Sequence, residues 1–423
     1  MKKIALFLIL CIAHVAATDA QNTLFLETPN APTGNTVNLV RTYKANDSYV
    51  SYHEPGNVNV FLLFNQGSFC RSAKLPQGLI IRDFQILNDT LFFCGLKGKN
   101  GVFGYMPMPA FYMPTDTIWY DTVPYINPGY LTKIEVYTDP SDDHTVAVMR
   151  GNTLTPSGIT QSTYLIIAKI DGTYVDYYPY TQQQIEITGF DVTDNYIVAS
   201  AVDISNSEIY LGKIQKSNLC LINYIRFNDF MLNTGVGIQH LKSDDITLNI
   251  TVYDVPNNQF MSRIYTVDMT NFTNLQTQDV LIPQKSFPDE MVYLDSLNML
   301  LMLQRSNEIT NNHSYVYYLN PYNNSYIAKM EYVLDDYCNS IDKNGNRYYI
   351  AVEKPIGENH YFYTRNVIGP ASHCLLYDQT KVMPGPKFNS PSNPPQIINS
   401  IQKKFLITHI YTYSEALLEG CND

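Results

Sequence analysis

A polar turn dipeptide recurs along the chain about every 51 residues, and this repeat constrains the fold more than any other feature. Each dipeptide separates two runs of β-branched and aromatic residues that alternate with polar ones, a pattern typical of β-strands. The dipeptides are Asn46-Asp47, Asn88-Asp89, Asp142-Asp143, Asp194-Asn195, Asp244-Asp245, Asp295-Ser296, Asn344-Gly345 and a degenerate Lys403-Lys404. No stretch of helical length keeps a 3.6-residue period. We therefore predict an all-β chain.

Each repeat contains four strand-forming runs. In the fourth unit, for example, Phe190 and Val192 precede the dipeptide, Tyr196 to Val198 follow it, and Ile209 to Ile214 form the third run. About 50 residues for four short antiparallel strands is the size of a β-propeller blade. A lone sheet of this kind leaves both faces exposed, and radial stacking on similar sheets covers them. The repeat therefore predicts a single β-propeller domain.

Eight copies of the repeat predict eight blades. The last copy has only three runs, Ile397 to Ile401, Phe405 to Ile410 and Glu415 to Leu418. A spare strand near the N-terminus, Thr23 to Leu26, is expected to complete this last blade and close the ring, which removes free sheet edges. A seven-bladed ring is the alternative if a terminal unit is degenerate, and a pair of stacked β-domains is the third possibility.

The first 20 residues have the pattern of a secretory signal peptide. Lys2 and Lys3 precede the apolar stretch Ile4–Ala17, and cleavage is expected after Ala20 or, as an alternative, after Ala17. The apolar stretch is shorter than the roughly 20 residues that span a bilayer, and no later segment approaches that length. The prediction is an exported propeller domain over residues 21–423, in the periplasm, on the cell surface or outside the cell.

The charge balance excludes several classes of protein. The chain has 28 Lys and Arg residues against 39 Asp and Glu, a formal net charge of −11. Nucleic-acid binding is not expected, because it needs a basic face that displaces counterions from phosphates. With 45% hydrophobic and 16% charged residues, the chain is also unlike a disordered protein or a coiled coil.

Six cysteines remain once Cys11 leaves with the signal peptide: Cys70, Cys94, Cys220, Cys338, Cys374 and Cys421. An even number in an exported chain is compatible with disulfides. The pairs closest in sequence, Cys70 with Cys94 and Cys338 with Cys374, are the predicted bonds. The alternative is that several are buried free thiols that pack as small apolar side chains. No CxxC pair supports a zinc or redox site.

On this period and strand pattern, the chain resembles the exported bacterial β-propeller repeat proteins of surfaces and cell envelopes. The resemblance is one of fold and covers nearly all of the mature chain. The only tryptophan, Trp119, is followed by Tyr120, so the Trp-Asp ending of WD40 repeats is absent. Sialidase boxes and kelch double glycines are absent as well. Because propellers host many unrelated functions, the resemblance implies a fold and no particular reaction.

Paired carboxylates are the candidates for general acid and base catalysis. They are Asp142-Asp143, Asp244-Asp245, Asp289-Glu290 and Asp335-Asp336. The first two coincide with the turn dipeptide, where Asp is favoured for its hydrogen bonds to nearby backbone. No metal-binding spacing of histidines, calcium loop, nucleophile elbow or phosphate-binding loop occurs. We therefore predict no metal, no cofactor and no catalytic residue.

Histidine and tyrosine supply the candidate binding residues. His240 and His409 lie in or beside predicted strands, where each could face the central channel or serve as a structural histidine. Exposed tyrosines can stack on sugar rings or anchor a protein partner, although tyrosine is also a common strand residue. The tyrosines singled out for binding are Tyr174, Tyr177, Tyr178, Tyr361 and Tyr363.

The sequence favours a secreted, non-enzymatic propeller that binds an extracellular or envelope protein or glycan. The alternative is a carbohydrate-active hydrolase or lyase with its site at the central channel, which requires one blade to place acidic or histidine residues inward where the others place small or apolar ones. A purely structural envelope component is the third hypothesis. The ligand and the oligomeric state stay open.

Overall fold

The computed structural model describes residues 24–27, 36–43, 47–54, 58–65, 68–74, 78–107, 119–171, 174–181, 185–203, 205, 208–227, 236–254, 259–282, 286–306, 314–323, 326–332, 337–344, 347–353, 361–366 and 396–398, some of them by their backbone alone. Nearly all of them are in strands or in the turns that join strands. The one helical element among the described residues is the 3₁₀ turn η2 (Asp295–Leu297). The all-β prediction is confirmed, while residues 1–20, the predicted signal peptide, lie outside the described part.

The described strands form seven antiparallel sheets, six with four strands and one with five. The first three sheets are β2 (Thr36–Tyr43), β3 (Asp47–Glu54), β4 (Val58–Asn65) and β5 (Ser68–Lys74); β6 (Leu79–Leu87), β7 (Thr90–Lys97), β8 (Asn100–Pro107) and β9 (Trp119–Thr122); and β10 (Gly129–Thr138), β11 (Thr145–Leu154), β12 (Thr160–Asp171) and β13 (Tyr174–Tyr180).

The five-stranded sheet and the three that follow it complete the set. They are β14 (Ile185–Val192), β15 (Tyr196–Asp203), β16 (Glu208–Gln215), β17 (Leu221–Phe227) and β29 (Gln396–Ile398); β18 (Val236–His240), β19 (Asp245–Asp254), β20 (Gln259–Asp268) and β21 (Thr273–Ile282); β22 (Ser286–Leu294), β23 (Met299–Ser306), β24 (Ser314–Leu319) and β25 (Tyr326–Tyr332); and β26 (Tyr337–Asn344), β27 (Arg347–Glu353), β28 (Tyr361–Asn366) and β1 (Leu24–Glu27).

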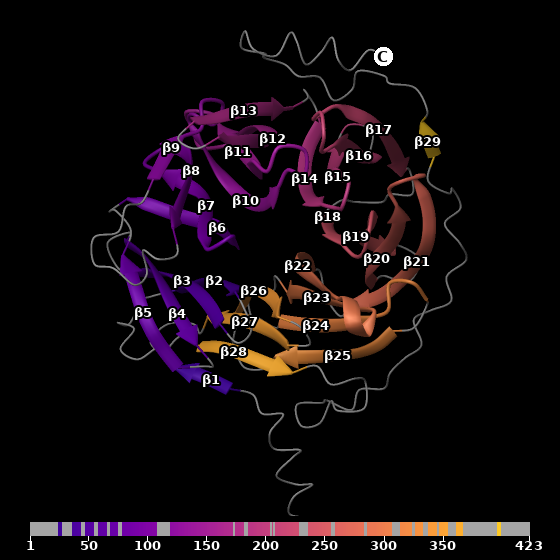
Figure 1. The fold of residues 1–423 in the computed structure, drawn as a ribbon. Helices are drawn as coiled ribbons and strands as arrows, with labels where there is room; N and C mark the ends of the chain where they lie inside the picture. Colours follow the sequence, from indigo (N-terminus) through magenta and orange to yellow (C-terminus); the bar gives the residue numbers. More distant parts are fainter. Residues whose placement is uncertain are drawn as a thin grey trace, which may run out of the picture.

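The sheets lie around a common centre in chain order, each with its first strand innermost (Figure 1). The inner strand β26 packs against β2, so the last sheet along the chain lies beside the first. The N-terminal strand β1 pairs with β28, from Leu24 opposite Thr364 to Glu27 opposite Tyr361. Radially arranged four-stranded antiparallel sheets are the architecture of a β-propeller.

The strands expected for an eighth unit do not form a further sheet among the described residues. The N-terminal strand, predicted to complete that unit, instead joins the sheet of β26 to β28. Of the three predicted C-terminal runs, only β29 is described, and it extends the sheet of β14 to β17. The runs at 405–410 and 415–418 lie outside the described residues.

Five of the eight predicted turn dipeptides lie wholly within the described residues, and each falls at the junction of the first and second strands of its sheet. Asn88 and Asp89 connect β6 to β7 with positive φ angles of 48° and 57°, conformations that Asn and Asp tolerate best after glycine. Asp244 ends the turn before β19, and its carboxylate accepts hydrogen bonds from the Thr193 hydroxyl at 2.7 Å and the Asn195 main-chain N–H at 2.9 Å. Asp244 thus lies in a turn, as predicted, but its carboxylate links two sheets rather than bonding to nearby backbone.

The core lies between neighbouring sheets. In β15 every residue from Ile197 to Asp203 is buried, which is possible only where both faces of the strand are covered. Between this sheet and the next, Leu211, Leu248 and Tyr265 belong to one apolar cluster. Similar clusters join other neighbouring sheets. The sheets are thus held in their ring mainly by apolar surface that no single sheet could bury alone.

Candidate functional site

The inner strands of the seven sheets each have one edge that no other strand in the described residues pairs with. Each pairs with a second strand on one side only, so its other edge turns toward the centre of the ring (Figure 1). Main-chain N–H and C=O groups on such an edge need partners. Six of the seven inner strands also contain a β-bulge: β2, β6, β10, β14, β22 and β26. A bulge redirects side chains and interrupts regular pairing.

Carboxylates from one inner strand satisfy the main chain of the next. In three places a carboxylate accepts a hydrogen bond from a main-chain N–H of the following inner strand: Asp83 from Ile134 at 2.9 Å, Asp191 from His240 at 2.6 Å, and Glu290 from Ile341 at 2.8 Å. Gln85 does the same for the N–H of Val136, at 2.8 Å. The same device thus recurs between successive sheets.

Cations complement the carbonyl groups of the same strands. The Lys133 ammonium donates to the carbonyl of Phe190 at 2.8 Å, and Arg41 Nε donates to the carbonyl of Phe84 at 3.1 Å. In both cases the cation and the carbonyl belong to neighbouring inner strands. The polar groups along these edges are therefore bonded across the gaps between sheets, as buried polar groups require.

Arg41 connects four sheets. Its guanidinium donates to Asp83 at 2.5 Å, to Glu290 at 3.2 Å and to the Ser340 hydroxyl at 2.9 Å. The Ser340 hydroxyl in turn donates to the second oxygen of Glu290 at 2.8 Å. Burial lowers the pKa of Arg41, but Asp83, Glu290 and Asp342 together raise it well above its ordinary value. Arg41 is therefore a permanent cation that holds this part of the ring together.

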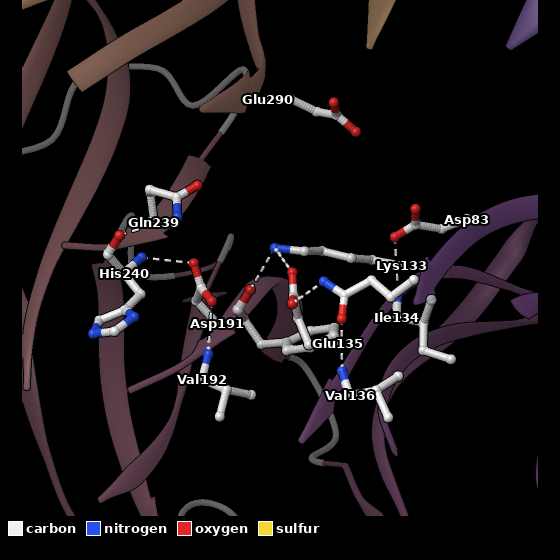
Figure 2. A network of polar contacts seen from close by, with 12 residues as sticks. Asp83, Lys133, Ile134, Glu135, Val136, Asp191, Val192, Gln239, His240 and Glu290 are labelled. Atoms are coloured by element: carbon white, nitrogen blue, oxygen red, sulfur yellow. Dashed lines mark hydrogen bonds and ion pairs between the residues drawn. The ribbon is translucent and has the colours of Figure 1, made fainter. Parts of the chain in front are cut away.

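Lys133, Glu135 and Asp191 form a second cluster. Figure 2 shows the side chains of Lys133 and Glu135 meeting, while the Asp191 carboxylate beside them accepts from the main-chain N–H groups of Val192 and His240. The Lys133 ammonium lies 3.6 Å from a Glu135 oxygen, and Gln85 donates to the other oxygen. Burial, together with the negative charges of Asp191 and Asp83, raises the pKa of Glu135 to about 7 even though Lys133 opposes the rise. The pKa of Glu135 thus lies in the physiological range.

Together these two clusters form an acidic centre, in which the charged side chains bond to one another and to the main chain of the inner strands. Arg41 and Lys133 supply two positive charges against the carboxyl groups of Asp83, Glu135, Asp191, Glu290 and Asp342. A carboxyl group whose pKa lies near 7 can donate or accept protons in catalysis. Within the part of the chain that is described, no group of three His, Cys, Asp or Glu residues is arranged to hold a metal ion.

The predicted binding residues are not brought together. The half-buried His240 is on the inner strand β18, where its main-chain N–H binds Asp191 and its ring Nε2 lies 2.9 Å from the Ser243 carbonyl. Tyr177 and Tyr178 are on the outer strand β13, where they pack at the edges of two different apolar clusters.

The remaining binding candidates lie elsewhere. Tyr174 is also on β13, and Tyr361 and Tyr363 are on β28 of another sheet, so these tyrosines form no common patch with His240. His409 lies outside the described residues. Their role in binding stays a prediction.

The predicted bond between Cys70 and Cys94 is not supported. Cys94 is a free, fully buried thiol on β7, and burial raises its pKa well above the ordinary value. The alternative interpretation, a thiol that packs as a small apolar side chain, describes this cysteine. Cys374, one partner of the other predicted bond with Cys338, lies outside the described residues.

Sequence reasoning missed the charged inner-strand residues except Glu290, which it named only as half of an acidic pair. Their signal is a polar residue on each side of one buried apolar residue, as in Asp83-Phe84-Gln85 and Lys133-Ile134-Glu135. This pattern resembles an ordinary half-exposed strand. Only the ring geometry shows that the polar side faces the edges of other inner strands.

Comparisons with known proteins identify no family. No protein-family model matches the chain, and no curated protein matches it. Among solved structures it is similar to the Dos1 propeller, with a TM-score of 0.49 and 10% identity over 78% of this chain and 77% of that chain. It is also similar to BamB from Moraxella catarrhalis, with a TM-score of 0.39 and 9% identity over 81% of this chain and 98% of that chain.

A third similar structure is the dihydro-heme d1 dehydrogenase NirN in complex with DHE, with a TM-score of 0.43 and 9% identity over 75% of this chain. The match spans only 64% of the NirN chain. The assignment of a β-propeller rests on the strand pairing described above, and nothing of these proteins' activities carries over. In the described part of the chain, no helix has the length and apolar character needed to cross a membrane.

Proposed function

We propose that this chain is an exported, non-enzymatic β-propeller that serves as a binding or scaffold module for a protein or glycan at the cell envelope. Export rests on the N-terminal signal pattern, and the mature protein would act in the periplasm, on the cell surface or outside the cell. The ring is a rigid frame whose loops and strand edges are available for partners.

We further propose that the ring has seven blades and that β1 closes it. Seven sheets among the described strands, the pairing of β1 with β28 and the packing of β26 against β2 support this count. Pairing the N-terminal strand β1 with β28, a strand of the last sheet in chain order, ties the ring shut.

One observation carries the preference for binding over catalysis. Carboxylates and cations occur on the inner strands of several sheets, and they bond to the main chain or to a charge on a neighbouring sheet. A catalytic centre would be expected to concentrate such groups on one side and to leave some of them available to a substrate. Here a structural requirement accounts for them.

The alternative, a carbohydrate-active hydrolase or lyase at the channel, is favoured by one residue. Burial, together with the negative charge of Asp191, raises the pKa of Glu135 to about 7, and a carboxyl group with a raised pKa can act as the general acid in glycoside hydrolysis. This hypothesis predicts turnover that depends on Glu135.

A paired assay separates the two functions. The mature protein is applied to a panel of envelope polysaccharides and surface proteins, and binding and the release of reducing or unsaturated sugar ends are measured on the same samples. Binding without release supports the proposal. Release that Glu135→Gln abolishes and that Asp142→Asn, a change in an exposed turn, leaves intact would establish the enzyme instead. No binding to any member of the panel counts against a binding module.

A further inference from the structure

The outer edge of β17 carries an additional strand. Among the described sheets, this is the one with five strands, because β29 pairs antiparallel with β17. The pairs are Tyr224 with Ile398, Ile225 with Ile397, and Arg226 with Gln396. The edge therefore accepts an extended segment from a distant part of the chain by main-chain pairing.

The pairing with β29 covers only part of this edge. The strand β17 spans Leu221–Phe227, whereas its pairing with β29 covers Tyr224–Arg226. The edge continues over Leu221–Asn223, where no other described strand pairs with it. Ile222 is 36% exposed there and is one of few large apolar side chains so exposed among the described residues. An extended segment of six or seven residues would pair with the whole of β17 and cover Ile222.

The composition of β17 also leaves its edge open to pairing. Outer strands commonly carry charges or proline that prevent the addition of another strand, as β13 does with Asp176 and Pro179. The only charged residue of β17 is Arg226, and its guanidinium lies 3.0 Å from Glu208 on the neighbouring strand β16. The charge is thus held within the sheet.

We propose that the outer edge of β17 is a strand-addition site for an extended segment of a partner protein, and that β29 covers this site when the partner is absent. The inference rests on the proposed binding function and names its partner as a polypeptide in extended conformation. Residues 367–395 connect β28 to β29, so β29 is a tethered competitor with an effective concentration on the order of millimolar. A longer partner strand displaces it by pairing with more of β17.

A peptide-binding experiment tests this site. The probe is a fluorescein-labelled peptide with the sequence of residues 394–401, and its affinity for the mature protein is measured by fluorescence anisotropy. In the protein, Ile397→Pro removes a main-chain donor and disfavours pairing of β29. We expect this variant to bind the probe at least about tenfold more tightly than the wild type, because the tethered competitor is gone. A probe with proline at the same position should not bind.

A matched pair of substitutions locates the binding. In the Ile397→Pro background, Ile222→Lys places a charge on the β17 edge and should weaken probe binding by about tenfold or more. Ile159→Lys changes another exposed isoleucine, 67% exposed in the connection between β11 and β12, and should leave binding unchanged. Equal affinities of wild type and Ile397→Pro, or no effect of Ile222→Lys, would overturn the proposal.

Two further measurements cover other outcomes. If Ile397→Pro does not fold, hydrogen exchange of β29 in the wild type should accelerate when the probe is added, and unchanged exchange would refute displacement. A wild-type dimer that Ile397→Pro abolishes would show that the edge serves exchange between copies of the chain, which also overturns a partner site. Binding on the polysaccharide and protein panel that survives both Ile397→Pro and Ile222→Lys would leave the proposed function standing without this site.

Discussion

Replacing Glu135 with glutamine should change how the stability of the ring depends on pH. The carboxyl group lies between Gln85 and Lys133 and faces other negative charges, which together with burial raises its pKa from 4.5 to about 7. Glutamine keeps an oxygen that can accept the hydrogen bond from Gln85 but cannot ionise. The variant therefore removes one titration and little of the packing.

The sign of the effect follows from proton linkage. Between pH 4.5 and 7 the folded protein holds a proton on Glu135 that the unfolded chain has released, so the free energy of unfolding falls as pH rises through this interval. A difference of that size corresponds to at most about 3 kcal/mol. Because the Glu135 side chain is 23% exposed and forms an ion pair with Lys133, we expect a measured loss of about 1–3 kcal/mol.

Urea unfolding at pH 5, 6, 7 and 8 measures this loss. The wild type should lose stability relative to Glu135→Gln across the series, with most of the loss complete by pH 8. Glu186→Gln provides a control, because that carboxylate is 43% exposed and lies 3.6 Å from Arg150 outside the cluster. Parallel curves for wild type and Glu135→Gln over the whole range would refute the assignment of a near-neutral pKa to this residue.

Three other substitutions or reactions test the ring. Arg41→Met should lower the free energy of unfolding by about 3–5 kcal/mol, since it leaves two carboxylates without their cation. Adding Asp83→Asn and Glu290→Gln should restore much of this stability. No recovery in urea unfolding would contradict the ion-pair argument. Asp244→Ala, which removes the acceptor of three hydrogen bonds, should cost about 2–3 kcal/mol by the same measurement, and a loss under about 0.5 kcal/mol would disprove its linking role. Cys94 should resist iodoacetamide in the folded protein and react in urea, as followed by mass spectrometry; rapid labelling of the folded protein would show that it is not buried.

Much of the fold is readable from local pattern. The runs around Asn88-Asp89 and Asp194-Asn195 alternate as strands and end in residues that favour tight turns, so each unit specifies its own strands independently of its neighbours. The pairing of the terminal strands β1 and β29 is harder to predict from the sequence. That Leu24–Glu27 joins β28, and that Gln396–Ile398 joins β17, depends on which edges the assembled ring leaves open. Strand propensity alone carries no such information.

The acidic centre could not be predicted from the sequence for a related reason. Asp83, Glu135 and Asp191 occupy alternate positions of amphipathic strands, and such positions normally face water. Asp83 and Asp191 accept from residues about 50 positions later, on the next inner strand. Glu135 accepts from Gln85, 50 positions earlier on the preceding inner strand, and no local pattern identifies these partners. Tyrosine clusters suggest a binding surface because exposed aromatic rings can stack on ligands, although Tyr177 and Tyr178 pack at the edges of the core.

The acidic centre also limits where a partner can bind. Each hydrogen bond from Asp83, Asp191 or Glu290 to the next inner strand fixes the spacing of two sheets, and a ligand that took over one of these carboxylates would leave a main-chain N–H without an acceptor. The centre therefore resists rearrangement on binding. The outer edges of the sheets differ, because their main-chain groups do not hold neighbouring sheets together. A partner can therefore bond to them without breaking contacts between sheets. A propeller bonded in this way is expected to keep a rigid interior and to engage partners at its periphery, and the strand seated on β17 is one such contact within the chain itself.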